Sequence, residues 1–186
     1  MESLLPHRSD PRELISYKKS RVIYEMTYYF CSHFLKKGDR TIDQMVQAAR
    51  SCKQNIIEGC SASATSSKTE IHLLSVAKAS LQELVEDYID YLATRGHQQW
   101  QQDSEEWKAM RELGRNHAEP EFFMKLCETR PPETIANMAI ILIKQCDYLL
   151  YRQLESLGKA FAENGGFSER MTRIRLQNRQ KIEAPR

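Results

Sequence analysis

The sequence predicts an all-α protein, an antiparallel up-and-down four-helix bundle, and three observations carry that prediction. Glycine and proline are both absent from residues 12–37, 39–58, 60–95 and 133–157, which leaves room for long helices because these residues cost the most inside a helix. Apolar residues recur in the four stretches with a period of about 3.6, as in helices that bury one stripe against each other. The first two connections are short, which favours antiparallel neighbours.

The ends of the first three helices are predicted from their capping residues. We expect Gly38 to end the first helix and Thr41 to cap the second, because glycine suits a C-terminal turn and a threonine hydroxyl accepts a backbone N–H. Gly59 is expected to end the second helix and to open a polar turn. Ser67 and Glu70 have the spacing of a capping box for the third helix.

A helical insertion is expected between the third and fourth helices, over residues 95–131. Amphipathic stretches at 104–113 and 121–128 predict a helical hairpin on the end or flank of the bundle, because a structureless loop of this length is unusual in a compact domain. Pro132 then stands near the first helical position of the fourth helix, where proline is tolerated.

The bundle and its insertion are expected to make one domain over residues 12–157, followed by a basic C-terminal extension over residues 158–186. The chain of 186 residues has a net charge of +2, yet the residues after 167 hold six basic side chains and two acidic ones. Three interpretations stay open: a solvated terminus, docking of its apolar residues on the bundle or on a neighbouring subunit, or an arm that binds phosphates. The candidate nucleic-acid-binding residues are Arg170, Arg173, Arg175, Arg179 and Lys181.

Motifs for catalysis, metal binding and phosphate binding are absent from the sequence. No histidine follows a glutamate by three positions, as it does in di-iron bundles, and the glycine patterns of nucleotide-binding loops and serine hydrolases are missing. We therefore expect no enzyme, no catalytic residue, no metal and no cofactor. The five cysteines are odd in number and never spaced as C-x-x-C, and neither a signal peptide nor a membrane span is recognisable. These features predict a cytoplasmic protein without a membrane partner.

Asn55, Glu58 and Glu83 are polar residues within otherwise apolar patterns. One interpretation is functional: a carboxylate pair for acid–base work, or a ligand contact. The other is structural: a buried polar network that fixes the helix register. We favour the structural network, because no histidine, lysine or nucleophile stands nearby in the sequence to complete a site.

The first helix carries more aromatic residues than one buried stripe requires. Either the inserted hairpin or another subunit covers the additional face. We favour self-association, because tyrosine and phenylalanine supply large contact areas at low entropy cost. The candidate interface residues are Tyr17, Tyr24, Tyr28, Phe30 and Phe34.

A pattern of fixed spacings over residues 45–84 carries a family resemblance. Its members are Ala48, Ala49, Ser51, Asn55, Ile56, Glu58, Gly59, Glu70, Ser75, Ala77, Ser80, Glu83 and Leu84. With this pattern the chain resembles the bacterial four-helix-bundle proteins encoded in intervening sequences of large-subunit ribosomal RNA, a family that includes the accessory protein of diversity-generating retroelements. The insertion and the C-terminal extension resemble the subgroup that bears a C-terminal suffix.

The resemblance implies an up-and-down bundle that assembles into a ring, which is pentameric in known relatives. It also implies a role with nucleic acid, since the retroelement member binds nucleic acid and a reverse transcriptase through a basic surface.

Together, these observations favour a non-enzymatic homo-oligomeric scaffold that binds RNA or DNA through a basic surface or its tail, largely without sequence specificity. The alternative is a protein–protein adaptor that uses residues 95–131, with Trp107, Phe122 and Phe123 as contacts, and has no nucleic-acid role. A small-molecule or metal-dependent enzyme is the third hypothesis.

Overall fold

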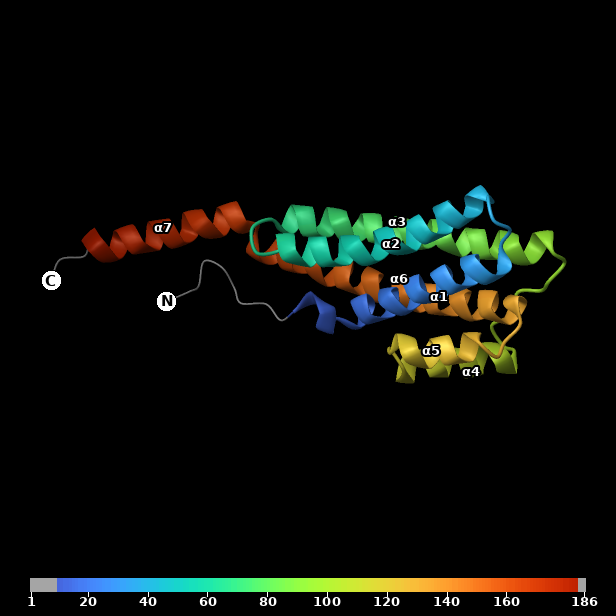
Figure 1. The fold of residues 1–186 in the computed structure, drawn as a ribbon. Helices are drawn as coiled ribbons and strands as arrows, with labels where there is room; N and C mark the ends of the chain where they lie inside the picture. The colour runs from blue at the N-terminus through green and yellow to red at the C-terminus, as the bar shows by residue number, and fades with distance from the viewer. Residues whose placement is uncertain (1–9, 184–186) are drawn as a thin grey trace.

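The computed structural model describes the backbone of residues 10–183, and this part of the chain is all-α, as predicted. The side chains of residues 164, 177, 178 and 180–183 lie outside the description. The elements in chain order are η1 (Pro11–Glu13), α1 (Ile15–Phe34), α2 (Arg40–Ala62), α3 (Ser67–Thr94), α4 (Glu105–Asn116), α5 (Pro120–Cys127), α6 (Pro132–Asn164) and α7 (Phe167–Glu183) (Figure 1). Among the described residues, no helix is long and apolar enough to cross a membrane.

The long helices α1, α2, α3 and α6 lie side by side around one apolar core (Figure 1). α2 packs against α1 and α3, and α6 packs against α3 and α1. Each of these helices turns one apolar stripe inward, and full burial of a large apolar side chain stabilises the fold by about 1.5–3 kcal/mol. The largest fully buried side chains include Met26, Phe30, Met45, Ile56, Leu74, Leu84, Tyr88 and Ile135.

The shorter helices α4 and α5 lie on one flank of the long helices (Figure 1). α4 packs on α6, and α5 packs on α1. Met110 of α4 and Phe123 of α5 are both buried, and the side-chain amide of Gln145 in α6 donates to the Arg111 carbonyl at 2.7 Å. Both amphipathic stretches of the expected insertion are therefore helical and packed on the rest of the chain.

Two of the predicted helix starts are corrected by one or two residues. α2 is capped by Asp39, whose carboxylate accepts the Thr41 N–H at 2.9 Å, so Thr41 is already inside the helix. α3 is capped by Ser66, whose hydroxyl accepts the Thr69 N–H at 3.1 Å, in place of the expected cap at Ser67. In both cases the earlier side chain reaches a backbone N–H that the helix leaves unsatisfied.

The two glycines expected to end helices both fall elsewhere in their elements. α1 already ends at Phe34, before Gly38. Gly59 lies inside α2, which continues to Ala62, and it is buried against α3. A Cβ at position 59 would come within 3.3 Å of the backbone oxygen of Glu70. The glycine at this position therefore permits close helix packing and does not terminate the helix.

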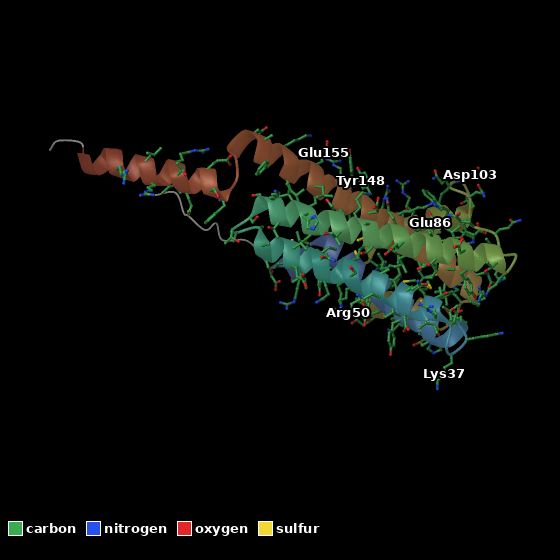
Figure 2. The ribbon with its side chains drawn as sticks, turned by 90° about the horizontal axis from the view of Figure 1, so that it is seen from above. Lys37, Arg50, Glu86, Asp103, Tyr148 and Glu155 are labelled. Carbon is green, nitrogen blue, oxygen red and sulfur yellow. The ribbon has the colours of Figure 1, made fainter. Side chains whose placement is uncertain are left out.

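The C-terminal extension begins later in the chain than expected. The extension was expected to begin at residue 158, but α6 runs through Gly158 and ends at Asn164. Gly165 then takes a φ of +71°, a left-handed value that favours glycine, and the Glu169 carboxylate accepts the N–H of Gly166. α7 leaves this joint and extends beyond the end of the long helices (Figures 1 and 2).

Candidate nucleic-acid interface

A groove of about 630 Å³ lies between α1, α4 and α6, and its charged lining is entirely basic. The basic residues are Lys19 of α1, Arg111 and Arg115 of α4, and Lys144 of α6, and no aspartate or glutamate lines the groove. No side chain in the described part of the chain forms an ion pair with any of these four residues. We call this site the basic groove. Its positive potential favours an anionic ligand.

Lys19 is the deepest of the four cations. Only 5% of the residue is exposed, and its ammonium donates to the Gly114 carbonyl of α4. Burial lowers the pKa of Lys19, because the charged form loses its hydration, while nearby Cys146 acts weakly in the other direction. A buried ammonium held by one neutral carbonyl gains more from an approaching anion than a hydrated surface lysine would.

Aromatic and apolar side chains complete the basic groove. The Arg111 guanidinium lies 5.1 Å from the ring centre of Trp107, and Tyr148 of α6 is 57% exposed. Figure 2 shows Tyr148 on the α6 side of the molecule, at the opposite edge from Arg50 of α2. Unstacked bases bind on exposed aromatic faces beside cations, so this lining is typical of a surface for single-stranded nucleic acid.

Sequence reasoning missed the basic groove, because its cations come from three helices that are far apart in the chain. Lys19, Arg111 and Lys144 each stand among ordinary mixed charges. Two local signals were present, since Arg111 and Arg115 are one turn apart and Trp107 is one turn earlier. Those signals place three residues on one face of α4, but only the packing of α4 on α6 shows what they face.

The arginines predicted to bind nucleic acid lie on α7, away from the basic groove (Figures 1 and 2). Arg173, Arg175 and Arg179 are exposed, and Arg170 is half-buried. Lys181 belongs to α7, but its side chain is outside the described residues. The described part of the molecule therefore has two separate basic surfaces.

One of the expected interface aromatics is wrongly assigned, because Phe30 is completely buried within its own chain. Its ring packs against Tyr88 and Tyr91 at centroid distances of 5.1 and 4.7 Å. Tyr17 and Phe34 are half-buried, and Tyr24 is half-buried with the Lys53 ammonium 4.2 Å from its ring centre. Tyr28 is 59% exposed and remains available to a partner.

The predicted polar network has different members from those expected. The side-chain amide of Asn55 donates to the carbonyl and to the hydroxyl of Ser51, at 2.8 and 3.1 Å, and Ser51 is joined to Ser80 of α3 at 3.0 Å. Glu58 and Glu83 are exposed, and within the described residues no hydrogen bond connects them to Asn55. The expected burial of the Glu58 and Glu83 carboxylates is wrong, because both side chains face outward. Ser51 and Ser80 make the polar contact between α2 and α3 instead.

The aromatics of the 95–131 segment are engaged with their own chain. Phe123 is fully buried, and Phe122 is half-buried with its ring stacked on His117 at 3.8 Å. Trp107 lines the basic groove. The expected adaptor contact at Phe123 is therefore corrected, because packing within the chain buries this ring, while Phe122 stays a prediction.

The potential metal ligands in the described part of the chain are dispersed, and most of its thiols are buried. Within residues 10–183, as far as their side chains are described, no three histidine, cysteine, aspartate or glutamate residues gather closely enough to hold a metal ion. Four of the five cysteines are buried, and burial raises the pKa of the Cys31 thiol to about 12 and that of Cys127 to about 11. Such thiols are poor nucleophiles at neutral pH.

The fold and the basic groove define an all-α protein with a basic groove that no carboxylate lines, and a family comparison agrees with the sequence pattern. The family model described as "23S rRNA-intervening sequence protein" matches residues 12–115, more than half of the chain. The chain belongs to this family. The match covers α1, α2 and α3 and nearly all of α4, while α5, α6 and α7 lie beyond it. No curated protein and no solved structure matches the chain.

Proposed function

We propose that this chain is a non-enzymatic, self-associating helical scaffold that binds single-stranded nucleic acid through the basic groove. The scaffold is an antiparallel up-and-down bundle of α1, α2, α3 and α6, with α4 and α5 as a helical insertion and α7 as a basic extension. One observation carries the proposal: four cations and two exposed or half-buried aromatic rings line one groove that contains no carboxylate.

The chemistry of the groove matches the two parts of a nucleotide chain. Lys144, Arg111 and Arg115 can neutralise phosphates and release counterions, and the faces of Trp107 and Tyr148 can stack on bases. Duplexes keep their bases stacked inside, so only a single strand uses both parts of the groove. Membership of a family named for an intervening sequence in 23S rRNA agrees with RNA as the preferred polymer.

Fluorescence anisotropy with a labelled single-stranded RNA of about 20 nucleotides tests the proposal over a series of salt concentrations. The double variant Arg111→Gln/Lys144→Gln should weaken binding on the order of tenfold and flatten the salt dependence, because each lost phosphate contact lowers the salt slope by about one. Tyr148→Ala should weaken binding to the single strand without changing the salt slope.

A matched control keeps the same helices and the same change of charge. Lys108→Gln/Lys159→Gln removes one lysine from α4 and one from α6, at exposed sites that pair with Glu105 and Glu155 and do not line the groove. This variant should bind within about twofold of the wild type. Equal losses in both double variants would refute the basic groove as the site.

The tail is tested separately by a chain that ends at residue 166. If the basic groove is the site, this chain should retain its affinity per protomer for the labelled RNA. A loss as large as that of the groove variant would instead support the α7 arginines. Light scattering on the intact protein measures the self-association, for which the family resemblance gives a pentameric ring as the expected form.

A further inference from the structure

α7 presents an apolar face that is only partly covered, since Phe167 and Ile174 are half-buried and Met171 is exposed. Phe167, Met171 and Ile174 recur at helical spacing, so they share one face, and Met171 is 44% exposed. Arg175 and Arg179 are one turn apart beside that face, and neither forms an ion pair with a described residue. α7 is thus a basic amphipathic helix of the kind that docks in a groove.

A second groove, of about 930 Å³, lies between α2 and α3. Four of its lining side chains are alanine or serine, and their small size lets another helix approach closely at these positions. Ala48 is 5% exposed and Ser80 is 6% exposed, and the Ser51–Ser80 hydrogen bond holds the two walls together. Ala48, Ser51 and Ser80 all belong to the sequence pattern that carries the family resemblance.

The rim of this second groove is acidic, and its charges have no cationic partner among the described residues. Glu83, Glu86 and Asp87 of α3 line it, and none of them forms an ion pair with a described residue. Figure 2 shows Glu86 on α3, beside α2. Burial, with repulsion from Asp90 and Glu83, raises the pKa of Asp87. A cation placed against this rim relieves that repulsion.

We propose that α7 of one copy docks as a helix in the α2–α3 groove of a second copy. The apolar face of α7 then covers the small side chains, and Arg175 and Arg179 meet the acidic rim. The spacing is matched, because Glu83 and Asp87 are also one turn apart. This inference rests on the self-association within the proposed function and names the two surfaces that produce it.

The geometry favours a second copy over the groove of the same chain. α7 points away from its own long helices (Figures 1 and 2). The turn at Gly165, with the Glu169 carboxylate on the Gly166 N–H, fixes that direction. Nucleic acid is a poor occupant of the same groove, because its phosphates would meet three carboxylates.

Sedimentation velocity on the full-length chain tests the contact by exchange of charges. The arm variant Arg175→Glu/Arg179→Glu and the groove variant Glu83→Arg/Asp87→Arg should each lose self-association by at least about tenfold. The combined variant, which carries all four reversals in one chain, should recover the association to within about threefold, because every arm is again complementary to every groove whatever the number of subunits. Recovery also shows that the four reversals leave the chain folded.

The control variant Lys108→Glu/Lys159→Glu reverses two charges outside both surfaces and should associate like the wild type. A wild-type chain that stays monomeric at every concentration overturns this contact together with the proposed self-association. A wild-type oligomer that both reversals leave intact, or a combined variant that fails to recover, overturns the α7 contact alone. RNA binding at the basic groove is measured independently of either result.

Discussion

Replacing Gly59 by alanine tests how closely α2 and α3 are packed. An added Cβ would lie 3.3 Å from the Glu70 backbone oxygen, 3.3 Å from the Leu73 Cβ and 3.5 Å from the Leu74 Cγ. The first two atoms belong to or adjoin the α3 backbone and cannot rotate away. The helices must therefore separate by a few tenths of an ångström, and we expect the packing of the α2–α3 interface to loosen.

Two opposing terms set the size of the effect. Overpacking of this kind costs about 1–3 kcal/mol. Alanine in place of glycine inside a helix gains about 1 kcal/mol. The net change for Gly59→Ala is therefore a destabilisation of about 0–2 kcal/mol. The larger Gly59→Val replacement adds two methyl groups at the same contact and should be more destabilising than alanine.

Gly158 provides the matched control, because it is also inside a helix but has no atom within 4 Å of an added Cβ. Gly158→Ala should stabilise the protein by up to about 1 kcal/mol. Urea unfolding followed by circular dichroism measures both variants, and the difference between them, about 1–3 kcal/mol, isolates the packing cost. Equal stabilisation by alanine at both positions would refute the close contact at Gly59.

Three further predictions concern buried groups. Tyr88→Phe removes a hydroxyl that lies 3.1 Å from the Thr27 hydroxyl in the core, and it should lower the free energy of unfolding by about 1 kcal/mol; an unchanged urea midpoint would contradict this. The pKa of Lys19 is lowered in the folded state, so the unfolded chain binds the Lys19 proton more tightly than the folded chain does. The contribution of Lys19 to the free energy of unfolding therefore rises as the pH increases from the lowered pKa towards the ordinary value of 10.5. The Tm of the wild type should therefore rise relative to the Tm of Lys19→Met between pH 7 and pH 10. A constant difference between the two Tm values over this range would disprove the prediction. Ellman's reagent should modify half-buried Cys60 before the four buried thiols, so Cys60→Ser should abolish the fast phase, and a fast phase that persists would assign it to another thiol.

The helices were predictable from the sequence because long stretches without glycine or proline carry apolar residues at helical spacing. The ends of the helices were less predictable, because a glycine can either end a helix or allow close packing within one. Gly59 has the sequence context of a helix terminus, but its role depends on α3 passing within van der Waals contact. Asp39 and Thr41 both qualify as caps, and only the backbone geometry decides in favour of Asp39.

The candidate sites were harder to predict than the helices. The α7 arginines lie close together in the sequence, between positions 170 and 179, and could be recognised as a basic segment. The basic groove combines Lys19 with Arg111 and Lys144, whose proximity depends on how α4 packs against α1 and α6. The role of Phe30 also depends on packing. The sequence showed that α1 carries more aromatic residues than one buried stripe requires, but it did not show that the Phe30 ring is buried against α3.

The left-handed turn at Gly165 has a consequence for symmetry. An arm that enters a neighbour's groove makes a head-to-tail contact, and repetition of such a contact either closes into a ring or grows without limit. In the proposed contact, the rotation from one protomer to the next would follow from the angle at which α7 leaves α6, and the torsion of +71° at Gly165 helps set that angle. A single backbone torsion thereby becomes a determinant of whether many copies form a finite particle or a fibre.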